Sequence, residues 1–345
     1  MDLGMIISLQ YGRALGAVLV VISHMMLYPP IGGSGGDSFG SLGVHLFFVI
    51  SGFIMWLTSA DLDFKEFFVK RISRIVPAYW LFTGVLIFIA VFIPKLAQNI
   101  DVSPKGAVLS LLFIPYYDRF EGINPILKQG WTLNFEMFFY FVFGLSLFLR
   151  QEVRFRAVVY CFVVLSIVGM LIEYENAIIE TYTSTNLLEF VFGMVIARFY
   201  RIRQVSQLES VALLVLGCAG MVATAFFETP VEARFFFYGG PCALLICGAL
   251  GFENALRRKP LPIMKALGDS SYSLYLSHTF VLSTVSAIVG RLTFFDETMK
   301  AIAFVGIGLT ACAVFAYLSY QFFERPAAKI VSNIGMKYVV RVSPA

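Results

Sequence analysis

Long apolar segments recur along this chain of 345 residues, and they constrain its fold more than any other feature. Hydrophobic residues make up 59% of the sequence and charged residues only 14%, whereas soluble domains carry about 25% charged residues. A helix that crosses the hydrocarbon core of a bilayer needs roughly 20 mostly apolar residues. The sequence therefore predicts an all-α, polytopic membrane protein with about ten transmembrane helices, at 6–28, 41–60, 77–97, 131–149, 156–173, 185–200, 209–227, 233–252, 271–290 and 300–323.

Lysine and arginine are distributed unevenly between alternate loops. When the N-terminus is placed inside, 19 of the 26 Lys and Arg residues fall on the cytosolic side, and cytosolic loops are the ones enriched in positive charge. We therefore expect both termini to be cytoplasmic. The first apolar segment is too long for a signal peptide and is expected to remain as the first helix. The net charge of +4 then reflects topology, and no nucleic-acid partner is expected.

The chain has no linker or hydrophilic block that would separate domains. We expect a single membrane-embedded domain over residues 1–345 with no appended soluble domain. The apolar stretch 107–114 is too short to span a bilayer and is expected at the outer leaflet. All five cysteines lie in predicted spans, without a CxxC pair, so neither disulfides nor a metal site are expected.

Two ionisable residues inside predicted spans are candidates for catalysis, because such residues are costly to insert and therefore tend to be functional. His24 lies eleven residues after Arg13, about 16 Å along a helix, in the outer half of the first span. Its imidazole suits proton or acyl transfer. Alternatively, it bonds only to a neighbour on its own helix.

Glu136, the second candidate, follows Trp131 by five residues on a helix that enters from outside. A carboxylate within reach of His24 would orient the imidazole and stabilise imidazolium, as the acid does in hydrolase triads. The alternative is a packing role, in which Glu136 bonds Tyr140, four residues later on the same helix face.

Three further ionisable residues, together with Trp131 and Tyr140, are weaker candidates for supporting roles. His278, on the side of the ninth span that carries Tyr275, is expected to be structural. His45 is expected to open the second helix just inside the outer interface. Glu324 ends the tenth helix at the cytosolic face, where it could pair with Arg71 or Arg74 or with the neighbouring Arg325.

Arg71 and Arg74 lie three residues apart, on one face of any helix, between the second and third spans. Two guanidinium groups at this spacing suit a phosphorylated cytosolic ligand, because each can bind two phosphate oxygens at once. Lys70 and Arg13 are expected near the same membrane face. An alternative is that the arginines only anchor the topology.

Six motifs in this chain resemble those of the membrane-bound acyltransferase family 3, the polytopic O-acyltransferases of bacterial surface polysaccharides and related acceptors. The resemblance covers nearly the whole chain. One departure is His45, because the family usually has an acidic residue at this position; Asp37 or Glu136 is a candidate to replace it. The motifs are LQYGRALGAVLVVISH, GVHLFFVISGFIM, FVKRISRIVPAYW, GWTLNFEMFFY, LGDSSYSLYLSH and FFERP.

The resemblance implies transfer of an acetyl or other short acyl group from cytosolic acetyl-CoA to a hydroxyl of an exopolysaccharide, O-antigen or lipid-linked saccharide. Arg13, Lys70, Arg71 and Arg74 would hold the acyl-CoA, which is a donor substrate and not a permanently bound cofactor. His24 would act either as a base or as an acyl carrier. The expected location is the bacterial inner (cytoplasmic) membrane, in contact with lipid.

Other functions remain open at this point. A transporter or flippase for a lipid-linked saccharide would also be polytopic, although such proteins commonly have repeated halves and we find no internal repeat. The enzyme could also transfer succinyl instead of acetyl, or act on a small-molecule acceptor.

Overall fold

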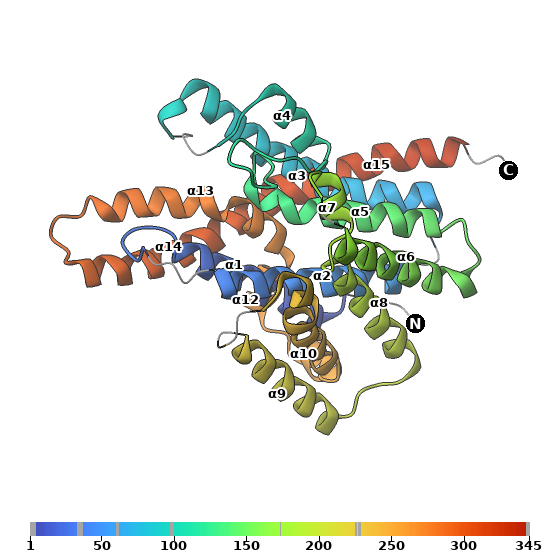
Figure 1. Cartoon of the computed structure of the whole chain (residues 1–345). Coiled ribbons are helices and arrows are strands. Elements are labelled where there is room, and N and C mark those ends of the chain that lie inside the picture. The colour runs from blue at the N-terminus through green and yellow to red at the C-terminus, as the bar shows by residue number, and fades with distance from the viewer. Residues whose placement is uncertain are drawn as a thin grey trace. The chain divides into compact units, whose positions relative to one another are not determined.

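The computed structural model describes residues 5–32, 37–59, 62–96, 100–172, 174–224, 226 and 229–342, and within these ranges the regular structure is entirely helical (Figure 1). The α-helices are α1 (Ile7–Met25), α2 (Asp37–Ser59), α3 (Phe64–Phe92), α4 (Pro104–Leu111), α5 (Trp131–Ser146), α6 (Gln151–Leu171), α7 (Ala177–Tyr182), α8 (Leu187–Ile202), α9 (Gln207–Ala223), α10 (Gly240–Leu250), α11 (Glu253–Arg258), α12 (Pro262–Asp269), α13 (Ser271–Gly290), α14 (Glu297–Ser319) and α15 (Arg325–Val342). Short 3₁₀ or π segments are η1 (Pro94–Leu96), η2 (Lys128–Gly130), η3 (Val231–Ala233), η4 (Phe235–Gly239) and η5 (Tyr320–Glu324).

Every predicted transmembrane segment contains a helix. Seven helical segments in the described part of the chain are long and apolar enough to cross a membrane: α1, α2, α3, α6, α13, the run from η3 to α10, and the run from α14 into α15. In the other three predicted spans, α5, α8 and α9 have 16, 16 and 17 residues. The protein is therefore an all-helical, polytopic membrane protein. The number ten and the side on which the termini lie stay predictions.

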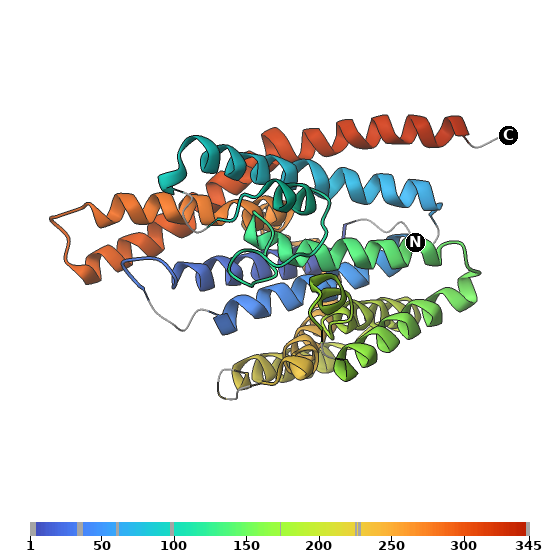
Figure 2. The same ribbon diagram turned by 45° about the horizontal axis from the view of Figure 1, so that its top comes forward.

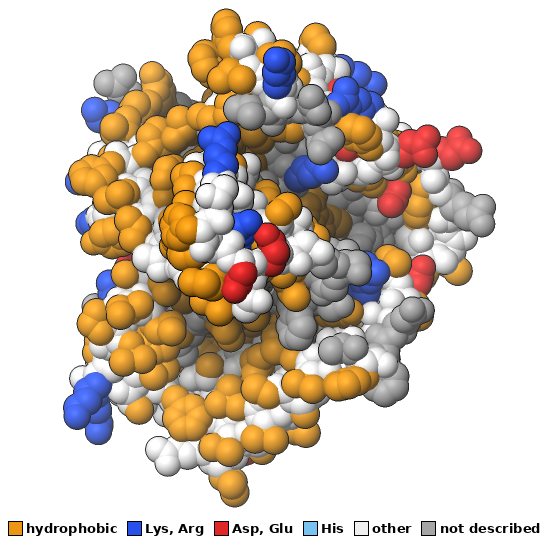
Figure 3. Space-filling view, turned by 90° about the vertical axis from the view of Figure 1, so that its left-hand side faces the viewer, with side chains coloured by type: hydrophobic (Ala, Val, Ile, Leu, Met, Phe, Trp, Pro, Cys, Tyr) orange, Lys and Arg blue, Asp and Glu red, His pale blue; other side chains and the backbone are white. Residues whose placement is uncertain are grey.

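Large hydrophobic side chains cover much of the outer surface. On α3, for example, Phe88, Val91 and Phe92 are 58%, 61% and 68% exposed. Figure 3 shows one face on which hydrophobic side chains predominate and charged side chains are scattered. Exposed apolar surface of this extent is unfavourable in water but matches the hydrocarbon of a bilayer.

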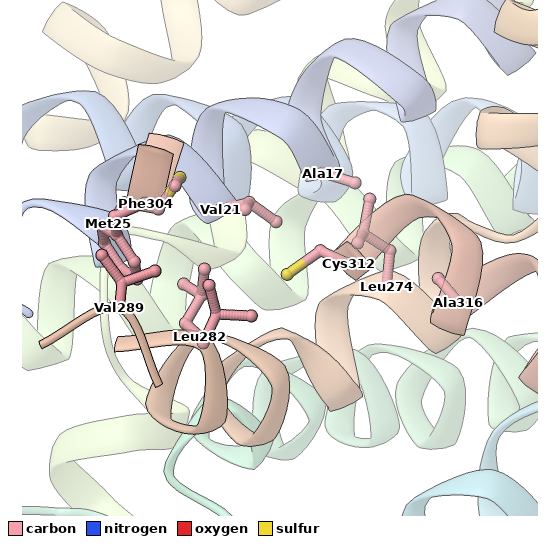
Figure 4. Packing of buried hydrophobic residues seen from close by; sticks show 10 residues of the cluster. Ala17, Val21, Met25, Leu274, Leu282, Val289, Phe304, Cys312 and Ala316 are labelled. Atoms are coloured by element: carbon pink, nitrogen blue, oxygen red, sulfur yellow. The ribbon is translucent and has the colours of Figure 1, made fainter. Parts of the chain in front are cut away.

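The chain forms two compact units. The first unit comprises Met1–Thr58 and Phe192–Tyr320. In it, α13 and α14 lie side by side (Figures 1 and 2). Helix α1 packs on both of them, and the three helices share one buried cluster (Figure 4), which consists of Ala17, Val21, Met25, Leu274, Leu282, Val285, Val289, Phe304, Cys312 and Ala316.

Helices α1 and α2 approach closely at a pair of glycines. A Cβ atom at Gly43 would lie 2.4 Å from the carbonyl oxygen of Gly16 and 2.8 Å from Val20. Small residues permit such contact between helices in membranes, where packing replaces the hydrophobic driving force. The GVHLFF motif therefore provides, besides the polar side chain of His45, the surface through which α2 contacts α1.

The N-terminus of α1 is capped by a carboxylate from a distant part of the chain. Glu253, at the start of α11, accepts hydrogen bonds from the backbone N–H of Ile7 (2.9 Å) and of Ser8 (2.8 Å), and from the Ser8 hydroxyl (2.8 Å). Arg257 donates to the same carboxylate at 2.6 Å. The first backbone N–H groups of a helix lack partners within that helix, so this contact both satisfies them and fixes the start of α1.

The second unit comprises Ser59–Val191 and Gln321–Ala345. Its core is rich in aromatic rings: Phe139 stacks on Phe190 with centroids 4.4 Å apart, and Phe67 contacts Phe143 at 5.4 Å. Helix α15 lies along α3 (Figures 1 and 2). Gly335 permits this contact, because a Cβ there would meet the side chain of Val69 at 2.7 Å.

Two helix boundaries differ from the predicted spans. Helix α3 begins at Phe64, thirteen residues before the predicted start, because the Asp63 side chain caps it by accepting from the N–H of Lys65. At the other end of the sequence, the helical path continues past Glu324 through the π segment η5 into α15. Pro326, the second residue of α15, directly follows the π segment η5, where the regular i→i−4 bonding of the helix is already interrupted.

Candidate active site

Two groups of polar side chains stand out, one in each unit. The histidine pair, His24 and His278, lies in the first unit. The arginine cluster, which comprises Arg71, Arg74, Glu136 and Tyr140, lies in the second.

His24, in the last turn of α1, is half-buried and contacts His278 of α13. The ring centroids are 4.8 Å apart and the ring planes meet at 66°, an edge-to-face contact. The sequence did not predict this pairing, since 254 residues separate the two histidines and His278 was expected to be structural. The tertiary structure thus places a second imidazole beside the predicted catalytic one.

Both imidazoles are tied to their own helices in the same way. The Nδ1 atom of His24 lies 2.9 Å from the carbonyl oxygen of Val20, and that of His278 lies 3.1 Å from the carbonyl oxygen of Leu274. A carbonyl oxygen can only accept, so Nδ1 carries the proton in each ring. In a neutral imidazole this leaves Nε2 as the hydrogen-bond acceptor.

His278 is completely buried, and its Nε2 makes no hydrogen bond with any residue that the structure describes. Apolar atoms of the α1–α13–α14 cluster surround this region. Cys312 donates its thiol to the backbone carbonyl of His278 at 3.8 Å, not to the ring. Because burial in apolar surroundings disfavours a charged imidazole, His278 is present as the neutral Nδ1–H form.

Arg13 lies on the same side of α1 as His24. Eleven residues correspond to about three full turns of helix, so the two side chains are nearly in line and about 16 Å apart along the axis. Arg13 is half-buried. The ten-residue gap in the sequence therefore fixes a common face as well as a separation.

Arg71 and Arg74 are the eighth and eleventh residues of α3. The Arg71 guanidinium lies over the ring of Phe67 at 5.9 Å from its centroid. Tyr140, Arg74 and Glu136 are the polar groups that interact with it electrostatically. Its Nε is buried and makes no hydrogen bond with the residues described. One of the two predicted phosphate-binding arginines thus points into the unit, toward α5.

Glu136 and Tyr140 are joined on α5, as their i, i+4 spacing predicts. The Tyr140 hydroxyl donates to the Glu136 carboxylate, and it also interacts with the Arg71 side chain. This hydrogen bond is the one expected if Glu136 has a packing role, which was the alternative to a catalytic one. Glu136 and His24 belong to different units, so the contact between them stays a prediction.

The remaining predicted residues occupy varied environments. Lys70 pairs with Glu66 of its own helix at 2.6 Å. Trp131 is the first residue of α5, and its ring meets Phe135 edge-to-face at 5.9 Å. Glu324, the last residue of η5, is buried.

His45 does not open the second helix, and that prediction is wrong. Helix α2 begins eight residues earlier, at Asp37. The helix therefore extends beyond the apolar segment predicted as the second span, which starts at residue 41. His45 is buried and stacks on Tyr238 with ring centroids 5.2 Å apart. The side chain of Asp37, the other candidate for the acidic role, lies outside the described part of the chain.

Sequence reasoning missed the meeting of His24 with His278 and the cap that Glu253 forms on α1. A signal existed for the first, because SYSLYLSH places a histidine inside an apolar span. Nothing local to Glu253 marks it as a cap. All five cysteines are free thiols, and the described residues contain no group of three side chains that could hold a metal ion.

Comparison with known proteins shows which family the sequence matches. The family model described as an acyltransferase domain matches residues 6–320. The chain is 37% identical over 300 residues to the exopolysaccharide production protein ExoZ of Rhizobium meliloti (strain 1021), and the match covers 83% of this chain and 89% of ExoZ. No solved structure matches the chain.

Two more distant relatives are O-acetyltransferases by name. The putative peptidoglycan O-acetyltransferase YrhL of Bacillus subtilis (strain 168) is 27% identical over 90% of this chain and 53% of its own length. The O-acetyltransferase OatA of Staphylococcus aureus (strain NCTC 8325 / PS 47) is 27% identical over 92% of this chain and 56% of its own length. This chain thus spans little more than half of either protein.

Proposed function

Because this chain belongs to the acyltransferase 3 family, we propose that it transfers an acetyl group from cytosolic acetyl-CoA to a hydroxyl of an extracellular polysaccharide, in the bacterial inner membrane. The names of its relatives support the acceptor class, since they concern exopolysaccharide production and peptidoglycan O-acetylation. The higher identity and fuller coverage of ExoZ favour an exopolysaccharide over peptidoglycan.

One observation carries the chemical part of the proposal, namely the tautomer of His24. Its Nδ1–H is held by the Val20 carbonyl, so Nε2 presents a lone pair that can take a proton. An acceptor hydroxyl is a poor nucleophile until its proton is removed, and a positioned imidazole is the usual side chain for that step.

In the proposed reaction His24 Nε2 takes the hydroxyl proton while the hydroxyl oxygen bonds to the thioester carbonyl carbon. The carbon–sulfur bond then breaks, and the proton passes to the sulfur of the departing CoA thiolate. A second route has the same balance: His24 Nε2 first bonds to the thioester carbonyl carbon as the CoA thiolate leaves. The acceptor hydroxyl oxygen then bonds to that carbon and displaces the imidazole, and the hydroxyl proton passes to the thiolate.

The donor would be held through its phosphates by Arg71 and Arg74, with Arg13 and Lys70 as further cations. Charge-assisted bonds to phosphate are strong and favour arginine. The interaction of Arg71 with Tyr140, and the nearby charge of Glu136, support this role indirectly, because they limit the positions that the guanidinium can adopt.

An acetyl-transfer assay tests the proposal. Purified protein in lipid nanodiscs is supplied with acetyl-CoA labelled in the acetyl group and with exopolysaccharide from the bacterium that encodes the chain. We expect label in the polysaccharide fraction and release of free CoA. His24→Ala should abolish both. Ile22→Ala, which alters an exposed apolar residue on the same helix, is the matched control and should retain the rate. If His24→Ala transfers label as the wild type does, the assignment of the chemistry to His24 is wrong.

A further inference from the structure

We propose that His278 is a positioning residue for His24: its neutral Nε2 accepts a hydrogen bond from His24 once His24 has taken the proton of the acceptor hydroxyl. This inference rests on the function proposed above, because it presupposes that His24 becomes positively charged during the reaction. A neutral imidazole would thus stabilise the imidazolium, as the carboxylate does in hydrolase triads, but through Nε2 of His24 and not through Nδ1.

The geometry of the histidine pair suits such a bond. An N–H···N hydrogen bond of about 2.9 Å between two imidazoles places their centroids roughly 5 Å apart. The observed centroid separation is 4.8 Å, so no movement of the helices is required.

The state of the His278 ring is the second argument. Its Nε2 is fully buried and makes no hydrogen bond with the described residues, whereas the large majority of buried polar atoms have a partner. The Leu274 carbonyl holds the proton on Nδ1, so Nε2 is fixed as an acceptor. An acceptor held in this way is suited to a donor that appears only during the reaction, which is the Nε2–H of protonated His24.

The need for an acceptor follows from the surroundings of His24. Imidazolium is costly in apolar surroundings unless it is hydrogen-bonded, and the neighbouring cluster is apolar. The charged residues that pack against α1 from α11 and α12 lie near its other end, because Glu253 caps Ile7 and Gly268 contacts Gln10. Among the described residues of the first unit, His278 is the imidazole placed against His24.

Two substitutions at position 278 distinguish this role from packing. His278→Phe keeps an aromatic ring of similar size but removes the lone pair, and we expect kcat to fall about ten- to hundredfold with KM for acetyl-CoA unchanged within about twofold. His278→Gln fits the site less well but brings a carbonyl oxygen to the position of Nε2, and should retain more activity than His278→Phe. If the residue served packing alone, the order of the two variants would be reversed, and that result would overturn the proposal.

A double variant tests whether His278 acts through His24. Combining His278→Phe with His24→Gln should lower kcat no further than His24→Gln alone, because His278 acts through His24. Multiplicative effects would refute the coupling. Leu282→Ala, which loosens the same buried cluster, reports the cost of altered packing and should change kcat less than His278→Phe does.

The outcomes separate this inference from the proposed function. An active His24→Ala enzyme contradicts both. An inactive His24→Ala enzyme together with a fully active His278→Phe enzyme contradicts only the role of His278. The melting temperature in detergent identifies variants that do not fold. If His278→Phe is one of them, the comparison of His278→Gln with Leu282→Ala decides. An inactive His278→Gln enzyme together with an active Leu282→Ala enzyme counts against an acceptor role.

Discussion

The histidine pair of the first unit and the arginine cluster of the second have different electrostatic environments. The two rings of the histidine pair are each tied to a backbone carbonyl, and the pair lies beside an apolar cluster. The arginine cluster carries permanent charge, and the carboxylate of Glu136 and the hydroxyl of Tyr140 interact with it. A group that changes charge during a reaction needs the first kind of environment, and a group that holds a charged ligand needs the second.

The sharpest test of this contrast is His24→Gln. Glutamine keeps hydrogen-bonding capacity but cannot take a proton, so kcat should fall by about 10²–10⁴-fold, the usual contribution of a general base. KM for acetyl-CoA should hardly change, because the proposed phosphate ligands are elsewhere. Steady-state kinetics with labelled acetyl-CoA measure both constants. A rise in KM with an unchanged kcat would exchange the roles of the two regions.

Substitution of Arg71 by alanine should have the opposite signature. Losing one charge-assisted bond of about 1.5–3 kcal/mol should raise KM for acetyl-CoA about ten- to hundredfold, and kcat should change far less. Arg71→Lys should restore binding only in part, since it cannot form the paired bonds of a guanidinium. Normal donor affinity in both Arg71→Ala and Arg74→Ala would exclude phosphate binding by this pair.

Glu253 tests whether the start of α1 must be fixed for the first unit to hold its shape. Glu253→Ala removes the acceptor for two backbone N–H groups and one hydroxyl, and should cost about 1–3 kcal/mol of stability. Thermal unfolding in detergent measures this change. Glu232→Ala, an exposed acidic residue of the same unit, should leave the melting temperature unchanged.

The same carboxylate predicts a dependence of stability on pH. Burial raises the pKa of Glu253, but the hydrogen bonds from Ser8, Arg257 and Ile7 together outweigh this effect, and its pKa lies below the ordinary value for glutamate. A group whose pKa is lowered by folding stabilises the protein above its unfolded pKa and loses this contribution as the pH falls through the folded value. The free energy of unfolding of the wild type should therefore exceed that of Glu253→Gln at neutral pH, and this difference should shrink as the medium becomes acidic. A difference that does not change with pH would contradict this account.

Tyr140→Phe distinguishes two roles for Glu136. If Glu136 and Tyr140 position Arg71, the loss of the hydroxyl should raise KM for acetyl-CoA about three- to tenfold, equivalent to about 1 kcal/mol for one hydrogen bond. If Glu136 instead supports His24, Glu136→Gln should lower kcat and leave KM nearly unchanged. The two constants, measured for both variants, assign Glu136 to one region or the other.

The smallest effect is expected in the loop that precedes α5. Asp118 accepts from the N–H groups of Phe120 and Gly122 and from the Asn124 amide. Burial raises the pKa of Asp118, but these bonds and Lys128 lower it further, so the net pKa lies below its usual range. Asp118→Asn should speed hydrogen exchange in this loop severalfold at neutral pH, and the difference from wild type should diminish as the pH falls. Equal exchange would mean that the carboxylate charge does not hold the loop.

Prediction from sequence succeeded where the cause is local. A bilayer demands long apolar helices whatever their neighbours are, and each of the ten predicted segments does contain a helix. The Tyr140–Glu136 bond follows from i, i+4 spacing alone. The start of α3 was missed because it depends on the cap formed by Asp63, a single polar residue that hydropathy does not weigh. The helical continuation past Pro326 was missed because α15 carries too many polar residues to be predicted as part of a span.

By itself the sequence determined that the protein is a polytopic membrane protein and which family motifs it carries. It also determined that Arg13 and His24 share one helix face. These results follow from the sequence because helix periodicity and the cost of burying polar backbone in lipid act on each segment separately. The meeting of His24 with His278, the capping of α1 by Glu253 and the approach of Arg71 to Tyr140 were decided only by the tertiary structure. These contacts join side chains that are between 69 and 254 residues apart. Their partners are selected by how whole helices pack, and helix packing depends on the combined shape of many side chains.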